Sequence, residues 1–260
     1  MAMPFTVVDA FADRPFAGNP AAVMLLDAWP DDALLQSIAL EHNLSETAFL
    51  VPIDGAADYE LRWFTPTVEV AMCGHATLAS GHVVLGDRDA VRFATRKAGV
   101  LTVGRDGDGY TLDLPVTRVA PAPDAALLAA LGCEGEVFAS VSGAQQTSII
   151  LLSDAAAVRA CAPDMAALSA CEVMAIVTAP GDVADIVSRV FVPAWGVDED
   201  PVTGSAHAAL APFWAERLGR ERFTAYQASA RGGHLTCRLA GDRALLGGQC
   251  VTVMRGELLP

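Results

Sequence analysis

The chain has 260 residues, of which 53% are hydrophobic and 18% charged, and its formal net charge is −14 at pH 7. A chain of this length and composition can bury one large core or two smaller ones, which excludes general disorder. Its acidic field would repel a phosphate backbone, so nucleic acid is not an expected partner. No uncharged apolar run of about 18 residues occurs, so neither a transmembrane helix nor a membrane partner is predicted.

Short strands dominate the elements predicted along the chain. The N-terminal segment has no cationic start and no long apolar run, so it predicts a strand over Pro4–Ala10 and not a signal peptide. A surface helix is predicted over Asp31–Glu41, because Leu34, Leu35 and Ile38 share one face. Further strands are predicted at Thr47–Pro52, Leu101–Val103, Tyr110–Leu114, Ser148–Leu152, Val173–Thr178, Leu235–Leu239 and Cys250–Met254. This pattern indicates an α+β fold with mostly antiparallel sheets.

A weak internal repeat divides the chain into two halves. RWFTP at 62–66 precedes CGHATLASGHVVLG at 73–86, and RVFVP at 189–193 precedes TGSAHAALAPFWAERLG at 203–219. Each half therefore predicts a strand, a proline turn, a small-residue corner and a buried apolar helix, the helices covering Ala76–Leu85 and Ala206–Leu218. Pro212 is expected to kink the second helix or to mark an irregular turn. A chance match in a chain rich in Ala, Gly and Val stays the alternative.

Two lobes follow from the repeat. The Pro- and Ala-rich stretch Pro115–Asp124 is the predicted link, with an N-terminal lobe at 1–117 and a C-terminal lobe at 118–260, the last strand being allowed to return to the first lobe. If the lobes are related, their corners could face each other across a ligand-binding cleft.

The two corners are candidate anion sites. The first corner, Cys73–Thr77, and the second corner, Asp200–Ala206, each open a helix whose N-terminal N–H groups can bind a carboxylate. Gly74 and Gly204 allow close approach of a ligand, and Ser205 could cap its helix or offer a hydroxyl. An ordinary helix cap is the alternative at each corner alone. Their matched positions favour a shared anionic ligand.

Four polar residues are candidates for the chemistry. Glu46, at the passage from a helix into an apolar strand, is either an exposed edge residue or a general acid/base. His75 could orient or protonate a ligand, or bond a neighbouring carbonyl. Asp200 ends an acidic run that could be a solvated loop. Asn19 lies in a Gly-Asn-Pro turn, as a plain turn residue or as an amide that reaches the site.

The six cysteines include neither a C-x-x-C pair nor a cysteine with histidine at zinc-ligand spacing. Reduced thiols and a cytoplasmic location are therefore expected. A thiol–histidine hydrolase would need His75 to reach Cys73 from two positions away, and a two-thiol racemase would need a cysteine where the repeat has Thr203. Cys73 is predicted to be a small buried residue.

Several segments together resemble the phenazine-biosynthesis isomerase-like (PhzF-like) family. They are VDAFADRPFAGNPAAV, NLSETAFLVP, RWFTPTVEVAMCGHATLASGHVVLG, RVFVPAWGVDEDPVTGSAHAALAPFWAERLG, QASARGGHLTCRL and VTVMRGEL, in the family's order from residue 8 to 258. The resemblance implies a diaminopimelate epimerase-like fold, in which each of two similar lobes curls a sheet around a central helix, with the active-site cleft between them. It also implies no metal or organic cofactor, and a homodimer.

Carried over residue by residue, the resemblance places the catalytic glutamate on Glu46 and its supporting groups on His75, Asp200 and Ser205. The expected substrate-binding positions are Asn19, Gly74, Ala76, Thr203, Gly204 and Ala206. The expected activity is a proton shift or epimerisation on a small carboxylic acid. Two alternatives stay open: a lyase or hydrolase on the same scaffold, and a non-catalytic protein that binds a small molecule.

Overall fold

The structure is a computed structural model that describes residues 2–141 and 146–259. The chain divides into two compact units: unit 1 comprises residues 1–113 and 247–260, and unit 2 comprises residues 114–246. The sequence-based boundary was set after residue 117, and the first segment of unit 1 ends at residue 113. No helix among the described residues is both long and apolar enough to span a bilayer.

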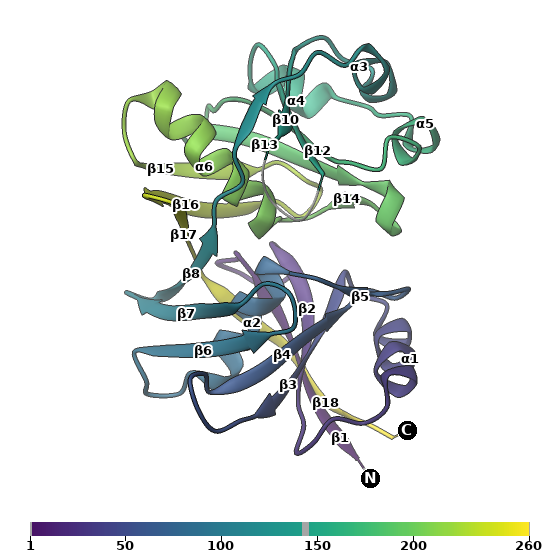
Figure 1. The fold of residues 1–260 in the computed structure, drawn as a ribbon, viewed down its shortest axis with the longest axis vertical. Coiled ribbons are helices and arrows are strands. Elements are labelled where there is room, and N and C mark those ends of the chain that lie inside the picture. Colours follow the sequence, from purple (N-terminus) through teal and green to yellow (C-terminus); the bar gives the residue numbers. More distant parts are fainter. Residues whose placement is uncertain (1, 142–145, 260) are drawn as a thin grey trace. The chain divides into compact units, whose positions relative to one another are not determined.

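Unit 1 is a mostly antiparallel sheet that curls around helix α2 (Gly74–Val84), which contacts strands on several sides (Figure 1). Helix α1 (Asp32–His42) packs on the other face of the sheet. The strands are β1 Met3–Ala10, β2 Asn19–Leu25, β3 Glu46–Pro52, β4 Tyr59–Phe64, β5 Glu69–Val70, β6 Ala90–Thr95, β7 Val100–Asp106, β8 Gly109–Pro115 and β18 Cys250–Leu258.

Unit 2 repeats this plan around helix α6 (Gly204–Leu218). Its strands are β9 Val119–Pro121, β10 Glu136–Ser140, β11 Thr147–Leu151, β12 Met174–Pro180, β13 Ile186–Val192, β14 Val197–Asp200, β15 Arg222–Gln227, β16 Gly233–Ala240 and β17 Arg243–Gly248. Its outer helices are α3 Ala125–Leu131, α4 Ala155–Ala160 and α5 Met165–Ser169, and Pro193–Trp195 forms a 3₁₀ turn. Strand β9 lies inside the predicted link and pairs with β10, so this stretch is partly a strand of unit 2.

The order of strand pairings confirms the repeat. In unit 1, β3 pairs parallel with β2 and antiparallel with β4, and β4 pairs antiparallel with β5 and parallel with β6. In unit 2, β12 pairs parallel with β11 and antiparallel with β13, which pairs antiparallel with β14 and parallel with β15. Glu46 and Met174 therefore hold equivalent positions, since each is the first residue of its strand.

An arginine–glutamate pair is duplicated as well. Arg62 on β4 binds both carboxylate oxygens of Glu69 on β5, through Nε and Nη2 at 2.8 Å each. Arg189 on β13 binds Glu199 on β14 through the same two nitrogens, at 2.8 and 2.9 Å. Such bidentate contacts fix the relative orientation of the arginine and glutamate side chains as well as their separation. Each pair holds the short strand that leads into a corner.

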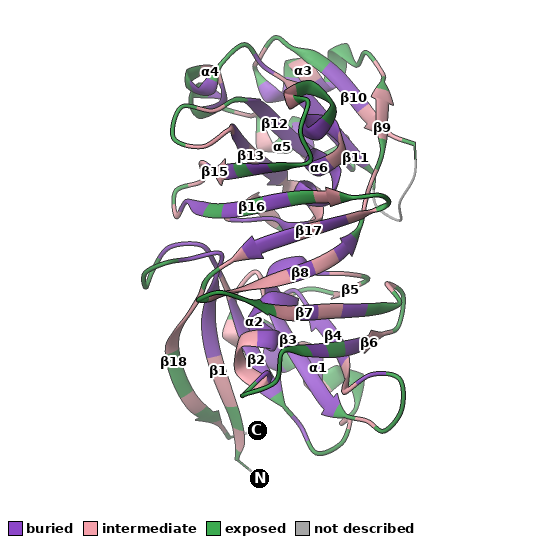
Figure 2. Ribbon diagram, turned by 90° about the vertical axis from the view of Figure 1, so that its left-hand side faces the viewer, coloured by how far each residue is buried: buried purple, intermediate pink, exposed green. Residues whose placement is uncertain are grey.

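Both central helices are buried, as their apolar sequences predicted. Residues 74–81 of α2 are all buried, and the buried strands around it stand out in Figure 2. Strands β3 and β12 are buried along almost their whole length, because helices cover both faces of the sheet. The outer faces form separate apolar clusters, under α1 in unit 1 and under α3, α4 and α5 in unit 2.

The helix containing Pro212 runs through the proline without a break, so the proline does not mark an irregular turn. Proline has no N–H for the carbonyl of Ala208 four residues earlier. The backbone N–H of Thr117 donates to that carbonyl at 3.2 Å instead. The proline therefore leaves no buried carbonyl without a partner at this point.

Candidate active site

Glu46 and His75 come together in unit 1. Helix α1 ends at Asn43 in the left-handed conformation, with φ of 48°, and the chain turns directly into β3, whose first residue is Glu46. His75 lies in the first turn of α2. Oε2 of Glu46 is 3.2 Å from Nε2 of His75, and the histidine side chain is 3% exposed while the glutamate side chain is 17% exposed. A carboxyl group with limited access to water thus faces a buried imidazole.

The imidazole of His75 is neutral. Burial lowers its pKa to about 3, and a hydrogen bond with the backbone of Pro20 offsets only part of that effect. The contact with Glu46 is therefore not an ion pair at neutral pH. The side-chain amide nitrogen of Asn19 lies 3.0 Å from Nδ1 of His75.

Asn19 is held in place by the turn that precedes it. The residue is fully buried at the start of β2 and pairs with Ala10 of β1. Gly18 has φ of +63°, and a Cβ there would lie 2.2 Å from the carbonyl oxygen of Ala10. No other residue fits this turn without displacing the backbone. The Gly-Asn-Pro motif thus directs the Asn19 amide to His75.

Cys73 also lies beside the imidazole of His75. Its Sγ is 3.5 Å from Nδ1 of His75, whereas Glu46 faces Nε2. The three groups have donor atoms within 4.8 Å of one another, which is the spacing of a loose metal-ligand set. A single ion needs thiol, carboxylate and one ring nitrogen to converge on it. Here the thiol and the carboxylate lie within 4.8 Å of each other as well as of the ring, but their contacts with His75 involve different ring nitrogens, Nδ1 for the thiol and Nε2 for the carboxylate.

The second corner, in unit 2, has a different polar set. The hydroxyl of Thr203 donates to Oδ2 of Asp200 in a very short hydrogen bond. The hydroxyl of Ser205 lies 3.8 Å from Sδ of Met174. Met174 and Ser205 thus repeat the positions of Glu46 and His75, with a thioether in place of the carboxylate.

Gln227 contacts the second corner, although the sequence did not predict it as a site residue. Its side chain is fully buried and its Oε1 accepts from the N–H of Thr203 at 2.9 Å. The sequence contained one signal, since Gln227 is the polar end of an otherwise alternating strand and opens the matched segment QASARGGHLTCRL. Nothing in that segment indicated a contact 24 positions away.

The N-termini of the two central helices differ from those of the outer helices. Each of α1, α3, α4 and α5 has an aspartate cap whose side chain accepts from a backbone N–H of the first turn. The caps of α2 and α6 are Cys73 and Thr203, and neither makes a side-chain cap hydrogen bond. Gly74, Ala76, Gly204 and Ala206 are buried there. Each corner thus presents uncapped N–H groups beside polar side chains, as an anion site requires.

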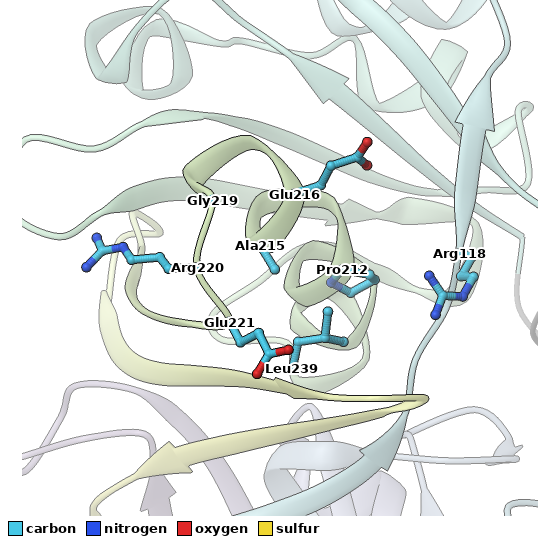
Figure 3. A pocket seen from close by; sticks show the side chains of 8 residues that line it. All are labelled: Arg118, Pro212, Ala215, Glu216, Gly219, Arg220, Glu221 and Leu239. Carbon is cyan, nitrogen blue, oxygen red and sulfur yellow. The ribbon is translucent and has the colours of Figure 1, made fainter.

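A separate hollow of about 340 Å³ lies at the C-terminal end of α6 (Figure 3). None of the candidate site residues lines it. Its walls combine two arginines with two glutamates, so it has no single electrostatic preference, and Arg220 already pairs with Asp185. The lining residues are Arg118, Pro212, Ala215, Glu216, Gly219, Arg220, Glu221 and Leu239.

Structural comparison assigns the fold to the epimerase-like α+β proteins. A hydroxyproline epimerase from Agrobacterium vitis superposes with a TM-score of 0.64 at 14% identity, covering 99% of this chain and 92% of that one. This likeness concerns the fold alone.

The chain belongs to the phenazine biosynthesis-like protein family, whose model matches residues 8–256. A crystal structure of a PhzF-family phenazine biosynthesis protein from Enterococcus faecalis superposes with a TM-score of 0.91, at 41% identity over the whole of both chains. An uncharacterized isomerase of Pseudomonas aeruginosa is 50% identical over 259 residues, covering 96% of each chain. These relationships support an isomerase-type function.

Proposed function

We propose that this chain is an isomerase that moves a proton within a small carboxylic acid, with Glu46 as the acid/base. Glu46 takes a proton from one carbon of the substrate and returns it to another, so the carboxyl group ends as it began. The carboxylate of the substrate binds uncapped helix N-termini. We further propose that Asp200 and Ser205 support the same reaction.

The observation that carries this proposal is the contact between Glu46 and a neutral His75. A protonated imidazole 3.2 Å away would hold the carboxylate in its ionised form as an ion pair. Because the pKa of His75 is lowered to about 3, the ring that faces the carboxylate carries no positive charge at neutral pH. The carboxyl group can then alternate between base and acid during one turnover.

The test is deuterium incorporation from D₂O into a panel of cyclic and α-amino carboxylic acids, followed by NMR. Glu46→Gln removes the acid/base and is expected to lower the labelling rate about 10²- to 10⁴-fold. Glu41→Gln is the matched control, because Glu41 is an exposed residue of the same unit and the charge change is identical. Asp200→Asn and Ser205→Ala test the supporting roles.

The outcomes separate the proposal from its alternatives. Labelling by the wild type and by Glu41→Gln, with loss in Glu46→Gln, supports the proton shift, and the labelled carbon identifies the reaction. Loss of a leaving group from the same acid would favour a lyase. Binding of an acid with no labelling at any position would favour a non-catalytic binding protein.

A further inference from the structure

The side chain of Gln227 contacts two polar residues of the second corner, Asp200 and Thr203. Its Oε1 accepts from the N–H of Thr203 at 2.9 Å, and its Nε2 donates to the carbonyl oxygen of Asp200 at 2.7 Å. Nε2 also lies 3.3 Å from Oγ1 of Thr203. Because a backbone N–H can only donate, the atom that faces it must be the amide oxygen. The partners of Gln227 therefore fix the orientation of its amide.

We propose that Gln227 is a positioning residue for the reaction, acting through Asp200 and the first turn of α6. The proposal rests on the proposed function, in particular on the role given to Asp200. A hydrogen bond from Nε2 of Gln227 to the hydroxyl oxygen of Thr203 leaves that hydroxyl to donate to Asp200. Gln227 thus sets the direction of the hydrogen bond that holds the Asp200 carboxylate.

Comparison with unit 1 shows that the fold itself does not require this glutamine. The parallel pairing of β4 with β6 sets Leu61 against Thr95, and that of β13 with β15 sets Ser188 against Gln227. Thr95 is therefore the counterpart of Gln227 in unit 1. Its hydroxyl donates to the carbonyl of Gly99 in its own turn, at 2.8 Å. The equivalent strand thus forms with a short side chain that serves only its turn.

The loop after Gln227 is held against the second corner by its own contacts. The hydroxyl of Ser229 donates to the carbonyl of Pro201 at 2.8 Å and accepts from the N–H of Gly232 at 3.1 Å. Gly232 has φ of +64°, and a Cβ there would lie 2.4 Å from the hydroxyl oxygen of Tyr226. These contacts do not involve the Gln227 side chain, so its replacement is expected to leave the loop in place.

The first measurement needs no ligand. Gln227→Met removes both the acceptor and the donor at nearly constant volume, whereas Gln227→Glu keeps the acceptor for Thr203. Amide hydrogen exchange of Thr203, measured by NMR, is expected to accelerate about ten-fold or more in Gln227→Met and to stay near the wild-type rate in Gln227→Glu. Amides in the middle of α6 serve as internal references for global opening.

The second measurement is the deuterium-labelling rate with the acid that the wild type labels fastest. In both variants the labelling rate at neutral pH is expected to be about ten-fold or more below that of the wild type. The carboxylate introduced by Gln227→Glu cannot donate to Asp200 and repels it, but it regains an O–H donor when protonated. The rate of this variant relative to wild type should therefore rise as the pH falls, while that of Gln227→Met stays constant. Gln249→Glu, at an exposed glutamine, is the matched control.

The results separate the positioning role from the proposed function. Wild-type labelling rates in both Gln227 variants, with labelling lost in Glu46→Gln, overturn the positioning role and leave the proposed function standing. Absence of labelling in every acid overturns the proposed function. The hydrogen-exchange rate of the Thr203 amide in Gln227→Met then decides whether Gln227 holds the second corner. If Gln227→Met fails to fold, the labelling rate of Gln227→Glu decides. A rate that recovers towards the wild-type value at low pH supports the positioning role, and a loss of rate that does not change with pH overturns it.

Discussion

The carboxylate of Glu46 and the imidazole of His75 face each other across 3.2 Å, although one residue begins a strand and the other lies in the first turn of a helix. The histidine is buried and neutral, with a pKa lowered to about 3 by desolvation. The pair is therefore a carboxyl group next to an uncharged ring. This relationship has consequences for the pH dependence of both the site and the fold.

The imidazole of His75 should not titrate between pH 5 and 8, because its pKa lies below that range. Its Cε1–H resonance, assigned by comparison with His75→Gln, is expected to keep a constant chemical shift by NMR. Free imidazole in the same tube provides the titrating reference. A midpoint near the ordinary histidine value of about 6.5 would show that the ring is charged beside Glu46.

Stability should fall as the solution is acidified below about pH 6.5, because His75 and His207 are buried in neutral form. Burial lowers the pKa of His207 to about 4 in the folded protein. The unfolded chain binds a proton at each site first, so the stabilisation is complete above pH 6.5 and is lost as the pH falls towards 4 and 3. Each group contributes a slope of about 1.4 kcal/mol per pH unit.

Urea unfolding of wild type and His207→Gln at pH 7 and pH 5.5 isolates one of these contributions. Between these two pH values the variant should lose about 1.2 kcal/mol less stability than the wild type, since one titrating histidine is gone. An identical loss in both chains would mean that His207 does not experience the burial that the structure shows.

Cys73→Ser should retain most of the labelling activity. Serine keeps the small size of Cys73 and a hydrogen-bonding atom next to Nδ1 of His75. The equivalent position in unit 2 is Thr203, so no second thiol could complete a two-cysteine mechanism. If the sulfur were an acid or base in the reaction, its removal would lower the labelling rate about 10²-fold or more. The rate with the same acid, measured beside Glu46→Gln, distinguishes the two cases.

Gly81→Ala should destabilise unit 1 by about 1–3 kcal/mol through overpacking. A Cβ at Gly81 would lie 2.4 Å from Cγ1 and 2.7 Å from Cβ of Val103, where α2 packs on β7. Gly104→Ala is the control, because the nearest atom there is 3.7 Å away. Adding Val103→Ala to Gly81→Ala should recover part of the loss. Equal urea midpoints for Gly81→Ala and Gly104→Ala would contradict this packing.

Sequence patterns located the elements better than their ends. The central helices were expected to begin at Ala76 and Ala206, but they begin at Gly74 and Gly204. The expectation followed apolar side chains, and glycine has none. The continuity of α6 through Pro212 could not be predicted either, because it depends on Thr117, a residue of another segment.

The candidate site was predictable in part. The motifs around Glu46, His75 and Asn19 identified residues that the structure brings together in unit 1. The contacts of Gln227 and Met174 in unit 2 depend on strand register and on side chains far apart in sequence. The pattern of neighbouring residues in the sequence does not predict contacts between residues so far apart. The catalytic roles of Glu46, Asp200 and Ser205 stay predictions until labelling is measured.

The pairing of β1 with β18 has a consequence for folding during translation. Met3 pairs with Leu258 and Ala10 with Cys250, so an edge of the first unit is completed by residues that are synthesised after all of unit 2. Pairing across such a sequence separation is slow to form, and an unpaired strand edge is prone to association. Unit 1 therefore cannot complete its sheet until β18 is synthesised, and until then one edge of β1 is unpaired. Chaperone binding during translation should be concentrated on this first strand.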